Sequence, residues 1–124
     1  MAPTDVTVEA QVVALLERTT RELGRLDILV NNSGVFDGGP LDELTLETWQ
    51  HVLNVNLTGA FLCTREAMKI MKRQHGGRII NIGSISAYKP RIEQGVYSAS
   101  RAGLLSLTRS TALEGRQYGV SASC

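Results

Sequence analysis

The sequence predicts an α/β fold in which helices alternate with the strands of a parallel sheet. Two short apolar runs, and the start of a third, alternate with longer segments whose apolar residues recur at helical spacing. The order helix, strand, helix, strand, helix, strand requires crossover connections, which are right-handed in parallel sheets. We therefore expect one domain, residues 1–124, with helices on both faces of the sheet.

The composition is that of a globular domain and argues against several classes of protein. Hydrophobic residues make up 43% of the chain, charged residues 20%, and the net charge is +1. This balance gives no electrostatic reason to expect nucleic acid or an anionic membrane as a partner. No apolar run is long enough for a transmembrane helix, and the first residues lack the pattern of a signal peptide.

The two cysteines, Cys63 and Cys124, form no redox or metal-binding motif. We expect two thiols in a reducing, cytoplasmic compartment, with a disulfide as the alternative, and no metal site.

The first segment with helical spacing follows Thr7 and ends at Gly24. Thr7 is of a residue type that caps helices, and Glu9 places a negative charge near the positive end of the helix dipole. Gly24 suits the left-handed conformation that ends many helices. Before this helix, Asp5-Val6 reads as the end of a strand or a short turn. The apolar face is formed by Val8, Val12, Leu15, Leu16 and Leu23.

The run Leu26–Val30 reads as a buried parallel strand, and it ends in Asn31-Asn32-Ser33-Gly34. Ligands of open parallel sheets bind beyond the carboxyl ends of the strands, so Asn31 and Asn32 stand where a site is expected. The alternative is a turn built from residues that tolerate unusual backbone angles.

A long helical pattern starts after Thr45, which can cap it, and runs through a bend near residues 54–59 to Met71. Asn56 is a polar residue inside this apolar stretch, so it is either a satisfied interior group or a bridge at a site. Glycines end the helix at Gly76-Gly77. The basic residues near its end complement the helix dipole, and a nucleic-acid patch is the much less favoured reading: Lys69, Lys72, Arg73 and His75.

The second strand, Arg78–Ile82, leads through Gly83-Ser84 and a loop to a helix over Tyr97–Tyr118, and residues 120–124 begin a third strand. Tyr97 and Arg101 are one helical turn apart and share a helix face. Ser84, on the preceding loop, can converge on the same point. Three such polar groups suit proton transfer to or from a carbonyl or alcohol oxygen. The alternative reading is a surface cation beside an aromatic residue at a helix start.

These motifs together resemble the short-chain dehydrogenases/reductases. Asn31-Asn32-Ser33-Gly34 is similar to the family's Asn-Asn-Ala-Gly strand end, and Asn56 matches its active-site asparagine. Ser84 and Tyr97 have the separation of its catalytic serine and tyrosine, and Asp5-Val6 resembles the pair that lies against the cofactor adenine. The resemblance covers the whole chain and is greatest to 3-oxoacyl-carrier-protein-reductase-like members. It implies part of a Rossmann-like, doubly wound parallel sheet.

The resemblance implies hydride transfer between NAD or NADP and a small-molecule carbonyl or alcohol. Tyr97 would be the general acid/base, Ser84 would orient the substrate oxygen, and Asn56 would hold a water in a proton relay. A free tyrosine has a pKa near ~10, so work at neutral pH needs a drop of about three units, which a nearby cation favours. The cofactor would be bound by Asp5, Val6, Asn31, Asn32, Tyr97 and Arg101.

Two features depart from the family pattern. Arg101 stands where the family has lysine, and arginine keeps the charge but does not readily release a proton. The glycine-rich phosphate loop, Thr-Gly-x-x-x-Gly-x-Gly, has no match in the chain. We therefore expect the central portion of a longer reductase. The rival interpretation is a non-catalytic remnant that acts through its dimerisation helices.

The resemblance also implies a homo-dimer or homo-tetramer assembled through helices 58–71 and 97–118. Strand Leu26–Val30 lacks a neighbour on one side, and an unpaired apolar edge favours pairing with another chain. We expect the isolated chain to be marginally stable or oligomeric.

Overall fold

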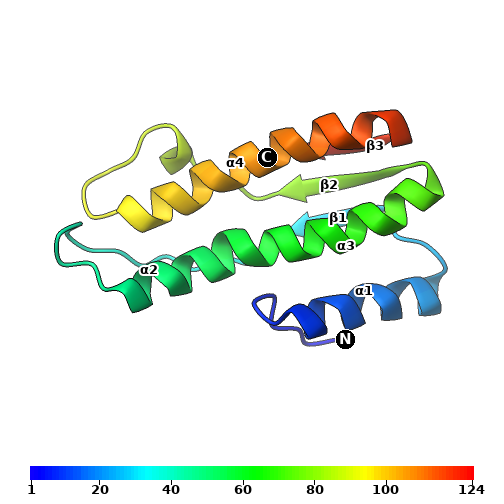
Figure 1. Ribbon diagram of the computed structural model, residues 1–124, viewed down its shortest axis with the longest axis horizontal. Helices are drawn as coiled ribbons and strands as arrows, with labels where there is room; N and C mark the ends of the chain where they lie inside the picture. Colours follow the sequence, from blue (N-terminus) through cyan, green and yellow to red (C-terminus); the bar gives the residue numbers. More distant parts are fainter.

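The computed structural model describes residues 1–124 and confirms the alternation of helices and strands (Figure 1). A π-helical turn, residues 54–58, joins the second helix to the third at the predicted bend, and short 3₁₀ turns lie at 85–87 and 116–118. The main elements are α1 (Glu9–Leu23), β1 (Ile28–Asn31), α2 (Leu46–Leu53), α3 (Gly59–Gln74), β2 (Gly77–Asn81), α4 (Gly95–Gly115) and β3 (Val120–Ser123).

The three strands form a parallel sheet in the order β1-β2-β3, with Val30 opposite Ile80 and Gly77 opposite Val120. The partial Rossmann-like arrangement is therefore confirmed. The helices, in contrast to the expected cover on both faces, gather on one face, and α3 and α4 lie in front of the strands in Figure 1. Strands added one after another in the same direction by right-handed crossovers place every connecting helix on the same side. The opposite face is open, so Ile28 is 57% and Val30 51% exposed.

The hydrophobic core lies between the covered face of the sheet and the helices. Side chains alternate between the two faces of a strand, so Ile79 and Val120 point into this core while their neighbours Arg78 and Ser121 are exposed. The core residues of the helices come mainly from α1 and α3: Val12, Leu16, Leu62, Cys63, Ala67, Met68, Ile70 and Met71.

The helix starts differ in how they are capped. Thr45 caps α2 as predicted, since its Oγ1 accepts a hydrogen bond from the Thr48 N–H at 3.1 Å. Thr7 does not cap α1, which begins after Val8. The Thr7 N–H and hydroxyl instead donate to the Asp5 carboxylate at 2.9 and 2.7 Å, because a carboxylate two residues earlier is the stronger acceptor.

A left-handed glycine ends α1 and another precedes β3, as the sequence predicts. Gly24 has φ 82° and Gly119 has φ 71°, conformations that glycine adopts without a side-chain clash.

The thiols of Cys63 and Cys124 are both free, and burial raises the pKa of Cys63. None of the helices combines the length and the apolar character that a bilayer crossing needs.

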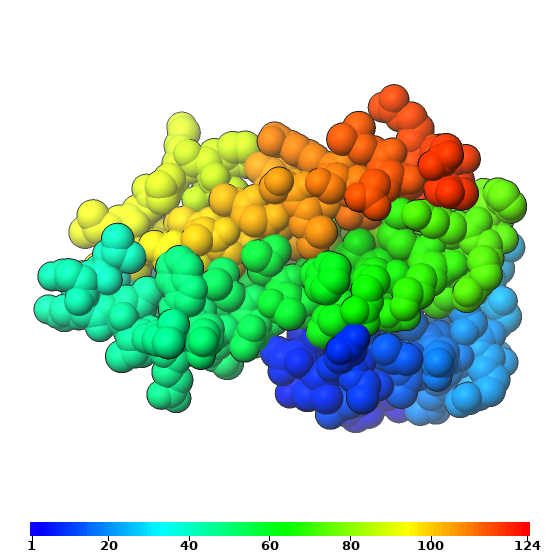
Figure 2. Space-filling model, viewed as in Figure 1, coloured from blue at the N-terminus to red at the C-terminus, as the bar shows by residue number.

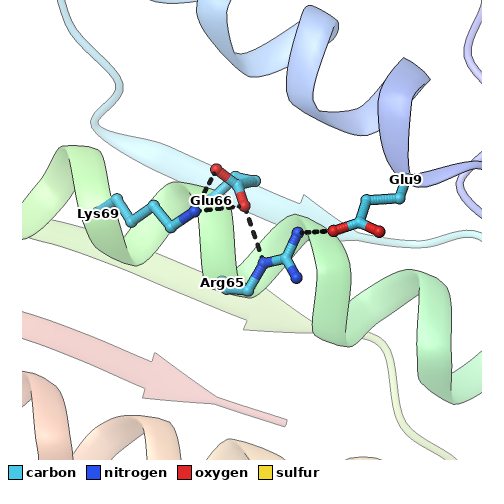
Figure 3. Close-up of polar contacts among 4 residues, drawn as sticks. All are labelled: Glu9, Arg65, Glu66 and Lys69. Atoms are coloured by element: carbon cyan, nitrogen blue, oxygen red, sulfur yellow. Dashed lines mark hydrogen bonds and ion pairs between the residues drawn. The ribbon is translucent and has the colours of Figure 1, made fainter.

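A chain of ion pairs ties α1 to α3 (Figure 3). Arg65 bonds Glu9 of α1 at 2.6 Å and its own neighbour Glu66 at 2.8 Å, and Lys69 bonds the same Glu66 carboxylate at 2.8 Å. Glu66 is only 9% exposed, so two cations neutralise a carboxylate that the packing largely removes from water.

Candidate active site

Tyr97 and Arg101 meet on one face of the first turns of α4, as their spacing predicts. The Arg101 Cζ atom lies 5.2 Å from the centroid of the Tyr97 ring, in cation–π contact. On another side, the ring of Phe36 contacts Tyr97 edge-on, with centroids 5.0 Å apart and an interplanar angle of 65°. The phenol is thus held between a cation and an aromatic ring.

Ser84 lies directly beyond β2 and reaches the same place. Its hydroxyl accepts a hydrogen bond from the Ser86 N–H at 3.2 Å and so caps the short 3₁₀ turn that follows. Hydrogen bonding from Ser84 is among the influences that lower the pKa of Tyr97. Tyr97, Ser84 and Arg101 therefore converge as the sequence predicts.

This surrounding changes the acidity of Tyr97. Burial, the largest single influence, raises the pKa of the phenol because it disfavours the charged form. Hydrogen bonding from Ser84 and Arg101, together with the positive charge of Arg101, outweighs burial, so the pKa of Tyr97 lies below its ordinary value of 10.0. The direction suits a phenol that exchanges a proton with a substrate oxygen.

Arg101 is 8% exposed and is fixed by the ends of two strands. Its Nη1 donates to the carbonyl oxygen of Ile82, just after β2, at 2.9 Å. Its Nη2 lies where a side chain at Gly34, after β1, would have to sit, which explains the need for glycine there. The buried Arg101 Nε–H has no hydrogen-bond partner in the protein.

Asn56 is 1% exposed and sits in the π-helical turn between α2 and α3. Its amide clamps the backbone of Val35: the Val35 N–H donates to Oδ1 at 2.8 Å, and Nδ2 donates to the Val35 carbonyl oxygen at 2.9 Å. Nδ2 also donates to the Ser100 hydroxyl at 3.1 Å, and that hydroxyl donates to the Tyr97 carbonyl oxygen at 2.7 Å. Asn56 thus connects the loop after β1 to the backbone of Tyr97.

Asn31 and Asn32 diverge at the end of β1. The Asn31 side chain points into the helix layer, where Nδ2 donates to Asn81 Oδ1 at 2.8 Å and to Thr64 Oγ1 at 3.2 Å. Asn81 in turn donates to Thr108 Oγ1 at 2.8 Å. Asn32 is exposed at the carboxyl end of the sheet.

Sequence reasoning missed Asn81, Thr108 and Ser100 as members of the polar networks under the site. The signal available for Asn81 was a single asparagine within the apolar run Ile79–Ile82. The hydroxyls of Ser100 and Thr108 carry no such signal, because small polar residues are common on helices.

Asp5 and Val6 lie at the edge of the sheet rather than beside Tyr97. The Asp5 carboxylate is exposed, and its bonds to Thr7 lower its pKa. Val6 packs against Gly59 and, with Asn31 and Ser33, borders a mainly apolar hollow of about 260 Å³ at the carboxyl end of β1. Such a hollow suits a flat ring, and the unpartnered Nε–H of Arg101 suits a hydroxyl-bearing ligand. The residues present therefore fit the two ends of a dinucleotide.

Comparison with known proteins identifies relatives along the whole chain. The family model for short chain dehydrogenase matches residues 1–124. A (5R,7aS)-5-hydroxy-7a-methyl-1-oxo-2,3,5,6,7,7a-hexahydro-1H-indene-carboxyl-CoA reductase of Mycobacterium tuberculosis is 43% identical over 117 residues, which are 94% of this chain and 45% of that protein. A 3-oxoacyl-[acyl-carrier-protein] reductase of Synechocystis is 40% identical over 111 residues, covering 90% of this chain and 45% of its own.

Solved structures also match nearly the whole chain. A short chain dehydrogenase from Mycobacterium smegmatis has a TM-score of 0.92 and 39% identity, over 96% of this chain and 50% of that one. An NAD⁺-bound xylitol dehydrogenase has a TM-score of 0.91 and 30% identity, over 96% of this chain and 46% of its own. The chain spans about half the length of the relatives it matches.

Proposed function

This chain belongs to the short-chain dehydrogenase family, and we propose that it forms part of a single NAD(P)-binding domain that transfers hydride between NAD or NADP and a small-molecule carbonyl or alcohol. One observation carries the proposal: Tyr97, Ser84 and Arg101 converge, and the pKa of Tyr97 lies below its ordinary value. Relatives named as reductases and dehydrogenases support the same reaction class.

The proposed roles follow from the positions of the side chains. Tyr97 gives a proton to the substrate oxygen in reduction and takes it back in oxidation. Ser84 binds the same oxygen and orients it toward the phenol. Arg101 keeps a positive charge beside the phenol and so favours the phenolate.

The remaining residues of the site act by binding and positioning. A bound nicotinamide supplies or accepts the hydride. Its ribose would be held by Tyr97 and Arg101, while Asp5, Val6, Asn31 and Asn32 would border the rest of the dinucleotide. Asn56 holds the loop after β1 in place through Val35, and it is the proposed partner of a relay water.

We also propose that two copies assemble through α3 and α4, which form much of the face shown in Figure 2. A hollow of about 330 Å³ lies between them, bordered by Phe61, Met68 and Leu107. Phe61 of α3 is 43% exposed, and Leu113 of α4 is 70% exposed. Exposed apolar side chains on neighbouring helices suit a symmetric contact.

Substitution of the phenol tests the reaction. The protein is assayed with NADH and NADPH against small ketones, and with the oxidised cofactors against secondary alcohols, by the absorbance of the reduced nicotinamide. Tyr97→Phe is expected to abolish turnover and to weaken cofactor binding, followed by nicotinamide fluorescence, by no more than the loss of one hydrogen bond, which is about tenfold. Tyr118→Phe, a partly buried tyrosine away from the site, is the matched control.

These measurements distinguish the oxidoreductase from the non-catalytic alternative. If a folded sample shows saturable cofactor binding and turnover that depends on Tyr97, the oxidoreductase is supported. If it binds neither cofactor at millimolar concentration, or if Tyr97→Phe leaves turnover unchanged, the proposal is wrong. A folded protein without cofactor binding that still dimerises supports the non-catalytic alternative.

A further inference from the structure

Tyr97 stands in the first turn of α4, and the start of this helix has no side-chain cap. The helix begins at Gly95, and the side chain of Gln94 before it makes no capping hydrogen bond. The Gln94 side chain is engaged elsewhere, because its Oε1 accepts a hydrogen bond from the Ser86 hydroxyl at 3.2 Å. Helix ends fray, and a glycine in the first turn adds backbone freedom. The first turn therefore needs another support if the phenol is to stay in place.

Ser100 supplies this support from inside α4. The residue is 0% exposed, and its hydroxyl donates to the Tyr97 carbonyl oxygen at 2.7 Å. The same hydroxyl accepts a hydrogen bond from Asn56 Nδ2 at 3.1 Å. Ser100 thus links the peptide group of Tyr97 to the π-helical turn between α2 and α3.

The backbone of Val35 fixes the direction of every hydrogen bond in this link. A backbone N–H only donates and a carbonyl oxygen only accepts, so Asn56 turns Oδ1 to the Val35 N–H and Nδ2 to the Val35 carbonyl. The second Nδ2 hydrogen then goes to the Ser100 oxygen, and the Ser100 proton goes to the Tyr97 carbonyl. Turning either side chain would leave a buried donor unpaired.

The loop that carries Val35 also contacts the Tyr97 ring. Phe36, the next residue, meets this ring edge-on with the two centroids 5.0 Å apart. The loop therefore reaches Tyr97 at two points, at its carbonyl through Asn56 and Ser100 and at its ring through Phe36. A peptide group and a ring that are both held by the same loop leave the phenol one direction in which to point.

We propose that Ser100 is a positioning residue of the hydride transfer, whose hydroxyl holds the first turn of α4 so that the Tyr97 phenol meets the substrate oxygen. The inference rests on the proposed function. Because Ser100 is fully buried, no ligand reaches it, and its loss should act on the chemical step rather than on binding. Misplacement of a reacting group by about 1 Å costs roughly a hundredfold in rate, so a smaller displacement is measurable in kcat.

Two serine variants on one turn of α4 test the positioning role. Ser100→Ala removes the hydroxyl without adding volume and should lower kcat for a secondary alcohol about tenfold, with KM for alcohol and cofactor within about twofold of native. Ser98→Ala is the matched control, because Ser98 is also buried, at 8% exposed, but its hydroxyl has no hydrogen-bond partner in the protein. This control should keep the native kcat and KM.

NMR of the protein with isotope-labelled tyrosine follows the phenol independently of turnover, and Tyr97→Phe assigns its signal. We expect Ser100→Ala to shift or split the Tyr97 signal and Ser98→Ala to leave it in place. A signal that moves only in Ser100→Ala, in a protein without turnover, contradicts the hydride transfer and supports the link. A native kcat in Ser100→Ala, or an equal loss in Ser98→Ala, overturns the positioning role while the activity stands.

The native protein offers a test that needs no variant. Asn54 lies in the same π-helical turn as Asn56 but is exposed. Since both Nδ2 hydrogens of Asn56 are bonded in the interior, they should exchange with solvent at least about tenfold more slowly than those of Asn54. Equal exchange rates, measured by NMR of the side-chain amides, would show that the link from Val35 to Tyr97 is not formed.

Discussion

Arg101 lies over the ring of Tyr97 with its Cζ 5.2 Å from the ring centroid, and it is held there by a hydrogen bond to the Ile82 carbonyl oxygen. An arginine side chain stays charged throughout the pH range of proteins. The phenol is therefore exposed to a positive charge that is held beside it. That charge, with the Ser84 hydroxyl, places the pKa of Tyr97 below its ordinary value despite burial.

The first prediction concerns the pH dependence of alcohol oxidation, which needs the Tyr97 phenolate. Because Arg101 lowers the pKa of Tyr97, activity should rise with pH through a value below that of free tyrosine. Arg101→Met removes the charge, so the pKa rises and the rising limb of the kcat profile moves to higher pH. The measurement is kcat for a secondary alcohol between pH 6 and about pH 10.

Arg101→Lys is the matched variant because it keeps the charge and restores a group that can pass protons. We expect it to raise turnover above that of the native protein while the rising limb stays below that of Arg101→Met. Equal profiles for all three proteins would mean that the cation at residue 101 does not act on Tyr97.

The second prediction concerns Asn56, which is buried and makes three hydrogen bonds to the backbone of Val35 and to Ser100. Asn56→Ala leaves the Val35 N–H and carbonyl without these partners and should lower the free energy of unfolding by about 2–3 kcal/mol. The measurement is urea denaturation. Asn54→Ala is the control: Asn54 lies in the same π-helical turn but is exposed, so its replacement should change stability by less than about 0.5 kcal/mol. Equal losses for both variants would contradict the clamp.

The order of the elements could be predicted because apolar spacing is a local property. The sequence predicts a strand over Leu26–Val30, and β1 spans Ile28–Asn31; Gly24 and Gly119 lie at turns, as predicted. The side of the sheet on which the helices lie could not be predicted in the same way. A run such as Ile28–Val30 is apolar at every position, so it indicates burial on both faces, whereas in these residues one face is open.

Some contacts of the candidate active site could likewise be predicted from the sequence, and others could not. Tyr97 and Arg101 are four residues apart on one helix, and helical geometry alone brings them together. Asn31 and Asn81, in contrast, are 50 residues apart, and they meet because the parallel register sets them opposite each other. Asn56 and Ser100 are 44 residues apart and meet only through helix packing. Register and packing are tertiary properties that no local pattern encodes.

The third prediction concerns the proposed assembly through α3 and α4. Phe61→Glu places a charge in an apolar contact between copies, so it should raise the dimer dissociation constant at least tenfold. The measurement is sedimentation equilibrium over a range of protein concentrations. Leu23→Glu introduces the same charge at an exposed apolar position at the end of α1, outside the proposed contact, and should not change dissociation. A native protein that is monomeric at every concentration and unfolds in one concentration-independent transition contradicts the proposal.

The fourth prediction concerns Glu66, a residue that is 9% exposed and whose carboxylate is bonded by Lys69 and Arg65 (Figure 3). The bond from Lys69 is the main cause that lowers the pKa of Glu66 below its ordinary value of 4.5, and burial opposes it. A lowered pKa in the folded state means that the ionised carboxylate stabilises the fold. Its contribution is complete above the unfolded pKa and is lost as the pH falls through the folded one.

Glu66→Gln keeps the shape of the side chain and removes the charge, so it should lower the free energy of unfolding at pH 7 by about 1 kcal/mol. Because glutamine does not titrate, the difference between the two proteins should shrink as the pH falls below about 4.5. Thermal and urea unfolding from pH 7 to pH 3 measures both effects. Glu22→Gln is the control. Glu22 pairs with Arg18, and the two side chains are 52% and 48% exposed. This substitution should therefore change stability little at any pH. A constant difference between native and Glu66→Gln down to pH 3 would show that packing, rather than the ion pairs, is what Glu66 contributes.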